Sequence, residues 1–452
     1  MTVGTVTVET LSRPRIKPEH RPYRTVDGNV RVGSVIYGIG AEIEDPNGWI
    51  WSLVEALDGT RTPDAVVDAV LARHPDLAAL AELDDEDVWQ GMADLFAAGF
   101  VEDAAAEVPL PDRERQRYSR GVPLLRWMDR GPRPSAWDAQ LRLREARVLL
   151  VGVGGTGGYA AQSLVASGVG RLHIVEPDVV ELSNLNRQPL YREPDIGRPK
   201  VAAALETLRA LNSDVTVTGE RREVRGPEDL AELIGAGGSA EGGSAEGAPG
   251  PEGRQGPEGG QGPEGGQGPE GRQGPEGRQG VAAAKPTPGT GISTSTSTGT
   301  GTGTLPAYDL LVLAADKPLH IWRWTNRACL AANLPWTDAG YRGPVASAGV
   351  FVPGVGACWE CLREGEFERR DLRLAPGADE EVASPRMPWN PASAVTAGLS
   401  GTLLAHAALS LLTGVPALDP GFRFGVNLMV PGDPVLERFP RRADCPACGH
   451  LP

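Results

Sequence analysis

An unbroken apolar run, ARVLLV at residues 146–151, is followed at once by the glycine-rich turn GVGGTG at residues 152–157. A run of this kind is typical of a parallel strand that is buried on both faces. Apolar runs and amphipathic segments then alternate: strands are expected at RLHIVE, VTVTG and YDLLVLAAD, and helices at AAQSLVASG, KVAAALETLRAL, PEDLAELI and IWRWTNRACLAAN. The alternation predicts an α/β fold with a Rossmann-like, mostly parallel sheet.

The glycine-rich turn has the composition of a phosphate-binding loop. Four glycines fill it: Gly152, Gly154, Gly155 and Gly157. Glycines let the backbone approach phosphate oxygens closely, and the N-terminus of the following helix offers free N–H groups. A merely tight strand-to-helix turn has the same signature. The next strand ends in Glu176 and Asp178, where an acidic side chain can accept the hydroxyls of a ribose, and this favours a nucleotide.

More polar side chains follow the second strand. The segment SNLNRQ supplies Asn184, Asn186, Arg187 and Gln188, and Lys200 begins the next helix. Arg187 can bind two phosphate oxygens at once, and the compact positive charge of Lys200 can pair with the developing pyrophosphate. Each cation alone would be read as a solvated surface residue. Combined with the glycine turn, they predict a polyphosphate site.

Asp316 ends the strand YDLLVLAAD, at the edge where ligands of open α/β sheets collect. A lone carboxylate there suits Mg²⁺, which typically takes one or two carboxylates together with substrate phosphates. The alternative is that Asp316 is the N-cap of the helix that begins near PLHIWRW. Both roles are compatible with each other.

Four of the five cysteines form two Cys-x-x-Cys pairs, Cys358 with Cys361 and Cys445 with Cys448. Two such pairs can supply the four thiolates of a structural, tetrahedral Zn²⁺ site. A C-terminal, zinc-bound β segment is therefore expected to follow the parallel sheet. A redox pair is the alternative for the first, but it leaves the second unexplained. The fifth, Cys329, lies on an apolar helix and is expected to be buried, as is His406 in the apolar segment LLAHAALSLL.

Taken together, GVGGTGG, EPDVVELSNLNRQ, GRPKVAA and LAAD resemble the ThiF-type adenylation domain of the ubiquitin-activating superfamily. The resemblance covers residues 113–452 and implies that Arg187, Lys200 and Asn184 hold ATP and that Asp316 binds Mg²⁺. It also implies that Glu176, where the family usually has aspartate, binds the ribose. The segment RYSRGVPLL resembles the family's N-terminal arm, so Arg120 would reach the ATP of a second protomer in a homodimer.

Two features narrow the resemblance to the microcin type, whose members modify the C-terminus of a ribosomal peptide. The stretch from ADKPLHIWRW to CWEC is similar to that type, and no cysteine lies between Cys361 and Cys445, where carrier-activating members have a catalytic cysteine. The resemblance therefore implies ATP-dependent adenylation of a peptide carboxylate. The alternatives are activation of a ubiquitin-like or sulfur-carrier protein, and a non-catalytic leader-peptide scaffold for a cyclodehydratase.

Residues 1–110 are predicted to form a separate winged-helix-like domain. An alternating segment over 23–40 indicates a β-meander, and three amphipathic helices are expected at GWIWSLVEAL, TPDAVVDAVLARH and DDEDVWQGMADLFAAGF. The module resembles peptide-recognition domains that bind a leader peptide as an added strand. Its acidic third helix disfavours nucleic acid as the partner. The sequence from there to about residue 145 is expected to be a linker.

Glycine and proline are concentrated in residues 236–304, which hold GPEGRQ and GPEGGQ hexads and a Ser/Thr/Gly tract. A collagen-like helix is conceivable from the glycine period, but a disordered insertion within the adenylation domain is the better interpretation. The net charge of −15 argues against nucleic acid or an anionic membrane as a partner. No apolar run of bilayer length and no signal sequence is recognised, so a cytoplasmic protein is expected.

Overall fold

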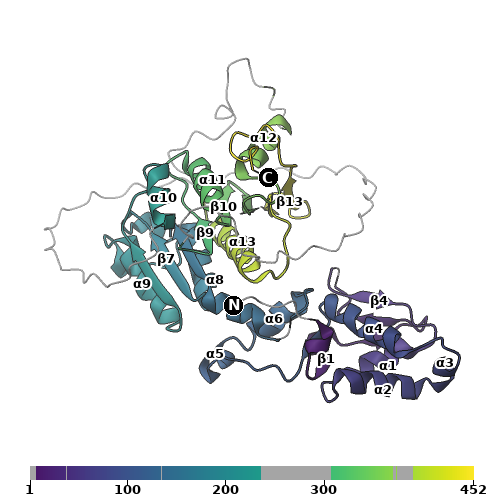
Figure 1. The fold of residues 1–452 in the computed structure, drawn as a ribbon. Coiled ribbons are helices and arrows are strands. Elements are labelled where there is room, and N and C mark those ends of the chain that lie inside the picture. The colour runs from purple at the N-terminus through teal and green to yellow at the C-terminus, as the bar shows by residue number, and fades with distance from the viewer. Residues whose placement is uncertain are drawn as a thin grey trace, which may run out of the picture. The chain divides into compact units, whose positions relative to one another are not determined.

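The computed structural model describes residues 7–36, 38–133, 135–235, 307–369, 373 and 390–451 (Figure 1). The insertion predicted at residues 236–304 lies outside the described residues.

An eight-stranded sheet is the centre of the larger part of the molecule. Its strands are β6 (Arg147–Val151), β7 (Arg171–Val175), β8 (Thr216–Glu220), β9 (Leu310–Leu313), β10 (Trp336–Arg342), β11 (Val345–Phe351), β12 (Phe422–Asn427) and β13 (Val435–Arg438). The order is β13-β12-β11-β10-β9-β6-β7-β8, and the pairs from β10 to β8 are parallel. This confirms the Rossmann-like sheet. The antiparallel extension β11–β13 agrees with the expected C-terminal β segment, but its individual strands and β10 were not predicted from the sequence.

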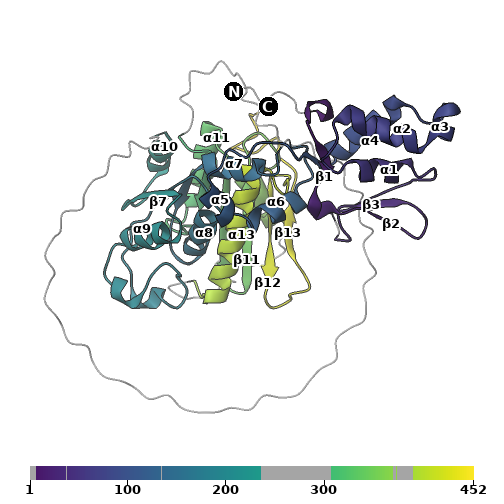
Figure 2. The same cartoon turned by 90° about the horizontal axis from the view of Figure 1, so that it is seen from below.

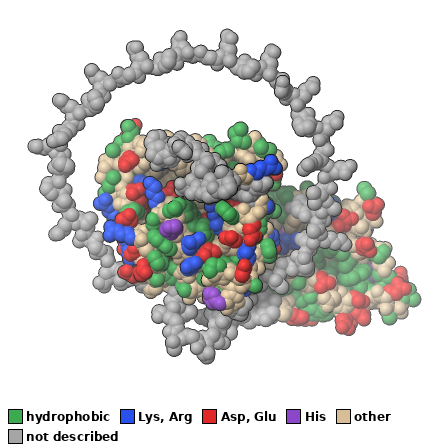
Figure 3. Space-filling view, turned by 90° about the horizontal axis from the view of Figure 1, so that it is seen from above, with side chains coloured by type: hydrophobic (Ala, Val, Ile, Leu, Met, Phe, Trp, Pro, Cys, Tyr) green, Lys and Arg blue, Asp and Glu red, His purple; other side chains and the backbone are tan. Residues whose placement is uncertain are grey.

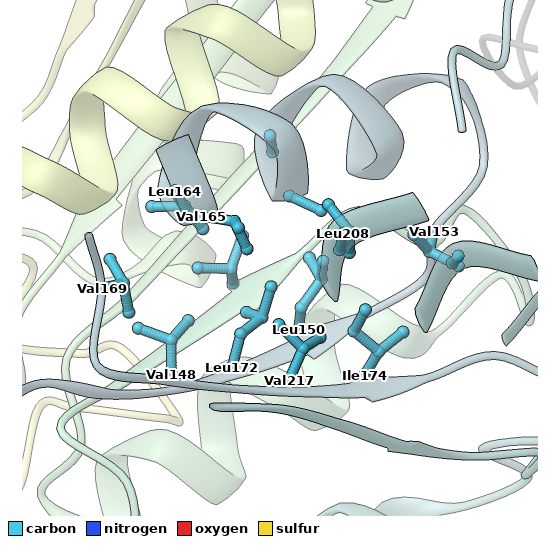
Figure 4. Close-up of a cluster of buried hydrophobic side chains, with 14 of the residues drawn as sticks. Val148, Leu150, Val153, Leu164, Val165, Val169, Leu172, Ile174, Leu208 and Val217 are labelled. Carbon is cyan, nitrogen blue, oxygen red and sulfur yellow. The ribbon is translucent and has the colours of Figure 1, made fainter. Parts of the chain in front are cut away.

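Helices cover both faces of this sheet (Figures 1 and 2). One layer contains α7 (Asp138–Glu145), α8 (Gly155–Ala166), α9 (Lys200–Leu211) and α13 (Ala394–Thr413); the other contains α10 (Pro227–Gly235), α11 (Ile321–Ala332) and α12 (Trp359–Arg369). Alternate residues of β6 supply the two cores, since Val148 and Leu150 belong to the first and Leu149 and Val151 to the second. Figure 4 shows the first core, where strand side chains meet Leu164, Val165 and Leu208.

Helix α13 is long and apolar enough to cross a membrane by length and composition, the one such helix among the described residues. Its packing explains this composition, because it contacts α8, β10 and β11 and is half buried in the domain. The prediction that His406 belongs to the core is wrong. Its ring is exposed and lies edge-on to Phe424, with centroids 6.1 Å apart.

The N-terminal module has its own core, built from strands and helices that follow the expected order. A meander of β2 (Tyr23–Arg24), β3 (Val30–Val32) and β4 (Ala41–Ile43) precedes α1 (Trp49–Ala56), α2 (Pro63–Arg73), α3 (Pro75–Ala79) and α4 (Asp85–Ala97). Sequence patterns did not indicate α3 or the pairing of β1 (Pro14–Ile16) with β5 (Val101–Asp103). The winged-helix interpretation and the domain boundaries remain predictions.

The expected linker contains helices. These are α5 (Asp112–Arg117), α6 (Gly121–Met128) and α7. Buried polar contacts join the end of α6 to the module: Lys17 donates from Nζ to the carbonyl of Asp129 at 3.2 Å, and Arg126 pairs with Glu102 at 2.6 Å. These contacts are made by charged side chains, which do not contribute to a hydrophobic periodicity. The hydrophobic pattern alone therefore suggested a linker.

Candidate nucleotide site and cysteine cluster

The predicted site lies where the strand order reverses. From β6 the chain proceeds to β7 on one side, whereas β9 pairs with β6 on the other, and the carboxyl ends of these parallel strands share one edge. Ligands of doubly wound sheets bind at this kind of switch point. Gly152 has φ of +91°, and a Cβ there would lie 2.8 Å from the backbone nitrogen of Ala315. The turn after β6 therefore touches the turn after β9, and a side chain at Gly152 is excluded.

Glycine is also required within the first turn of α8. A Cβ on Gly157 would overlap the carbonyl oxygen of Gly152. Gly155, the first residue of α8, faces α13, because a Cβ there would lie 3.0 Å from Cβ of Ala397. Glycine at positions 154, 155 and 157 thus leaves the start of α8 without side chains of its own at these positions, which suits a phosphate-binding turn.

Glu176 and Asp178 lie in different environments. Glu176 is 4% exposed, and its two carboxylate oxygens accept hydrogen bonds from the backbone N–H groups of Val153, at 2.8 Å, and Asp178, at 3.1 Å. Burial raises the pKa of this carboxyl group, and the nearby Lys200 opposes the shift. Asp178 is exposed, and its carboxylate pairs with the buried Lys200 ammonium at 2.9 Å. Glu176 thus holds the glycine turn in place through two hydrogen bonds, while the exposed Asp178 pairs with the buried Lys200.

The SNLNRQ segment is ordered by its own hydrogen bonds. Asn184 is buried, and its Oδ1 accepts from the backbone of Glu181 at 3.0 Å. Arg187 donates to the carbonyl of Ser183 at 2.7 Å and to the side-chain oxygen of Asn186 at 3.2 Å. Gln188 is 5% exposed and has an Oε1 without a hydrogen-bond partner. Its Nε2 would lie 3.7 Å from a Cβ on Gly154, so Gln188 lies beside the glycine turn. Its Oε1 can still accept a hydrogen bond there.

Asp316 lies three residues beyond β9 at the same edge and is exposed. The alternative role as a helix N-cap is wrong, because α11 begins at Ile321 with His320 as its N-cap. Its carboxylate therefore has no structural role in capping. Arg120 is the N-cap residue of α6 and is exposed.

The four predicted metal ligands come together. All four sulfurs lie within 4.8 Å of one another, and all four residues are buried. The Sγ atoms of Cys358 and Cys445 lie 3.7 Å apart, and those of Cys361 and Cys448 lie 3.4 Å apart. Four Zn–S bonds of about 2.3 Å in a tetrahedron place the sulfurs roughly 3.8 Å apart. The donor set and spacing fit a structural Zn²⁺ ion.

A polar shell supports this cluster. Asn326 of α11 is fully buried and donates from Nδ2 to Sγ of Cys358 at 3.6 Å, while its Oδ1 accepts from the backbone of Trp359 at 3.1 Å. The backbone N–H of Arg442 donates to Sγ of Cys361 at 3.4 Å. Hydrogen bonds to thiolate ligands hold them in place for a metal.

Residues 119–237 match the family model described as ThiF. The chain contains a ThiF family domain. The molybdopterin-synthase adenylyltransferase of Escherichia coli K12 is 40% identical over 109 residues, covering 24% of this chain and 41% of that protein. The sulfur carrier protein ThiS adenylyltransferase of Bacillus subtilis is 46% identical over 103 residues, covering 22% of this chain and 30% of that protein. The chain thus aligns with less than half the length of these relatives.

Solved structures extend the similarity beyond the ThiF domain. A crystal structure of E. coli MccB has a TM-score of 0.63 at 18% identity and covers 96% of each chain. MccB with ATP aligns at a TM-score of 0.59 and 17% identity, over 96% of this chain and 99% of that one. PaaA aligns at 0.54 and 19% identity, over 93% and 99%. The resemblance to the microcin type is therefore confirmed for the fold.

Two contributors to the ThiF domain site were missed from sequence. Oγ of Ser400 lies 2.7 Å from Oγ1 of Thr156, and both residues are buried. A Cβ on Gly401 would lie 2.5 Å from the carbonyl oxygen of Thr156. Figure 2 shows α13 beside α8. The small residues of α13 were the available signal, since they allow two helices to approach closely.

Proposed function

We propose that this chain adenylates the C-terminal carboxylate of a ribosomally made peptide with Mg-ATP and releases pyrophosphate. One observation carries the proposal: the glycine turn, Lys200 and Asp316 lie around a single sheet edge, in a fold that matches MccB along nearly its whole length. The named curated relatives are adenylyltransferases, which supports the reaction class.

In this reaction a carboxylate oxygen of the peptide attacks the α-phosphorus of ATP, and the bond to the pyrophosphate oxygen breaks. The backbone N–H groups at the start of α8 bind phosphate oxygens. Lys200 leaves its ion pair with Asp178 and pairs with the departing pyrophosphate instead. Arg187 can likewise leave the carbonyl of Ser183 and the side-chain oxygen of Asn186 to bind the pyrophosphate. Mg²⁺, held by Asp316, would offset the negative charge. The residues position the reactants and stabilise charge, and none needs to form a covalent bond.

The remaining predicted contacts belong to the same proposal. Asn184 and Gln188 hold the nucleotide, and the unpartnered Oε1 of Gln188 is available for it. Asp178 is a more accessible acceptor for the ribose hydroxyls than Glu176, whose oxygens are already engaged. Arg120 would complete the site of a second protomer in a cytoplasmic homodimer, and its exposure is compatible with that role.

A peptide is favoured over a carrier protein by the cysteines. All five are described; four form the cluster, and Cys329 is fully buried in α11. Burial raises the pKa of the Cys329 thiol, so the nucleophilic thiolate is disfavoured. Activation of a ubiquitin-like or sulfur-carrier protein remains the second candidate because one curated relative is named as the adenylyltransferase of the sulfur carrier protein ThiS. A non-catalytic scaffold is disfavoured by the complete set of phosphate-site residues.

The test is ATP–pyrophosphate exchange in the presence of a precursor peptide encoded next to this protein. Asp316→Ala and Arg187→Ala are each expected to lower the exchange rate about 100-fold or more, through lost charge stabilisation of about 3 kcal/mol. Arg198→Ala is the matched control, since Arg198 pairs with Asp195 and Glu206 away from the turn. Unchanged exchange in both site variants would refute the proposed site.

A further inference from the structure

The helical segment that joins the N-terminal module to β6 is the basic part of an acidic chain. Residues 113–147 contain ten arginines and four acidic residues. The face of the N-terminal module seen at the right of Figure 3 shows mainly acidic and apolar side chains instead. A phosphate group is therefore attracted to the joining segment and repelled by that face of the module.

Arg120 differs from the other nine arginines of this segment. Each of those nine has an ion pair or a hydrogen bond with a described residue. Arg120 is exposed and has neither in the part of the chain that the structure describes. Its guanidinium group is available to bind a phosphate, and such a contact is precise only if the chain around Arg120 is held in place.

The chain is held two residues earlier, at Tyr118. The side chain of Tyr118 is buried, and its hydroxyl oxygen accepts a hydrogen bond from Nδ2 of Asn212 at 3.0 Å. Gly168, with φ of +85°, lies against the same hydroxyl group, because a Cβ on Gly168 would overlap it. A larger residue at position 168 would therefore displace Tyr118.

Asn212 is fully buried and joins Tyr118 to two other parts of the sheet domain. Its Nδ2 also donates to the carbonyl of Val165 at 2.8 Å, and its Oδ1 accepts from the backbone N–H of Asp214 at 3.1 Å. The carboxylate of Asp214 pairs with Arg117 at 3.1 Å, on the other side of Tyr118 along the chain. A buried polar network with its hydrogen bonds formed holds the segment in one arrangement.

This anchor lies at the end of α8 that is opposite the glycine turn. Val165 and Gly168 are at the carboxyl end of the helix, whereas the glycine turn is at its amino end. Helix α8 has 12 residues and is therefore about 18 Å long. The separation favours a ligand on a second protomer over the nucleotide bound by the same chain.

We propose that Tyr118 and Asn212 are positioning residues, which hold Arg120 where its guanidinium group binds phosphate oxygens at the site of a second protomer. The proposal rests on the proposed function, in which Arg120 completes that site. Tyr118 and Asn212 touch no reactant. They restrict the backbone next to Arg120 in advance, so that less conformational entropy is lost when the guanidinium group binds.

The test is a double-mutant cycle on the full chain, measured by ATP–pyrophosphate exchange with the precursor peptide. Tyr118→Phe removes the hydroxyl group and keeps the ring, and we expect it to lower the exchange rate about tenfold. In an Arg120→Ala background the same change should have no further effect, because the group that Tyr118 positions is gone. Gln140→Leu is the matched control and should leave exchange unchanged, since Gln140 donates from α7 to the carbonyl of Ser167 beside Gly168.

Two outcomes of the cycle would overturn the proposal. One is normal exchange in Tyr118→Phe. The other is an equal loss from Tyr118→Phe with and without Arg120, which is the result expected of a merely structural residue.

Trypsin cleavage after Arg120, followed by mass spectrometry, gives a readout that does not depend on the reaction. Tyr118→Phe should speed this cleavage at least tenfold, because the segment opens more often without its anchor. Equal cleavage rates in Tyr118→Phe and the wild type would also overturn the proposal. Absence of exchange in the wild type would instead refute the proposed function, and the cleavage rates would still decide whether Tyr118 holds the segment around Arg120.

Discussion

The two carboxylates that follow β7 differ in what they can offer a ligand. Glu176 is buried and accepts two backbone hydrogen bonds, whereas Asp178 is exposed and holds Lys200. Sequence indicated that an acidic residue would lie at this strand end, and the structure has both there. It could not indicate which one faces the solvent, because that depends on how the turn folds back onto the strand end.

These environments predict that two isosteric changes, Glu176→Gln and Asp178→Asn, differ in their effect on stability. Glu176→Gln places an amide donor against backbone N–H groups, so we expect a loss of about 1–3 kcal/mol in the free energy of unfolding and weaker ATP binding. Asp178→Asn keeps an oxygen that can accept from the buried Lys200, so we expect a smaller loss of stability than in Glu176→Gln together with weaker ATP binding. Urea denaturation and ATP titration of both variants provide the measurement. A stable Glu176→Gln protein would contradict the bracing role.

At the scale of elements, strands β6 to β9 and helices α8 to α11 follow the predicted order. The apolar runs of the central strands β6 and β9 are continuous because both faces of these strands are covered. The C-terminal β segment was predicted, but strands β10–β13 were not assigned individually, since they carry Gly or charged residues that interrupt any apolar run. The contact between α11 and the cysteine cluster could not be predicted from sequence patterns, because the two segments are separated along the chain and come together only in the fold.

That contact predicts a role for Asn326 in metal retention. Its amide donates to Cys358 and to Glu360 and accepts from the backbone of Trp359, so Asn326→Leu removes all three bonds from a buried site. We expect Zn²⁺ to be released to a chromophoric chelator about 10-fold faster or more. Arg323→Ala is the control, since Arg323 contacts Glu360 from the same helix and touches no sulfur. Equal release rates in all three proteins would show that the contact does not stabilise the metal.

At the scale of the whole molecule, the chain leaves and re-enters the domain of the eight-stranded sheet at one place. Helix α10 ends at Gly235, and the backbone N–H of Ala307 donates to the carbonyl of Ile234 at 3.2 Å. The two flanks of residues 236–306 are therefore adjacent. A long connection between adjacent ends has a closure cost that grows only logarithmically with length.

Deletion of residues 240–302 should consequently leave the catalytic domain intact. We expect the free energy of unfolding to change by less than about 2 kcal/mol, because shortening the loop alters only its closure entropy. Denaturation and pyrophosphate exchange of the shortened protein, compared with the full chain, are the measurements. A loss of several kcal/mol or of exchange activity would assign a structural or catalytic role to the segment.

The central claim is that the peptidyl adenylate forms without a thioester on the protein. The most direct measurement incubates the full chain with Mg-ATP and its precursor peptide, then compares the masses of peptide and protein under non-reducing conditions. The account predicts AMP attached to the peptide, an unmodified protein, and the same result in Cys329→Ser. A reductant-sensitive adduct between protein and peptide that is absent in Cys329→Ser would contradict it.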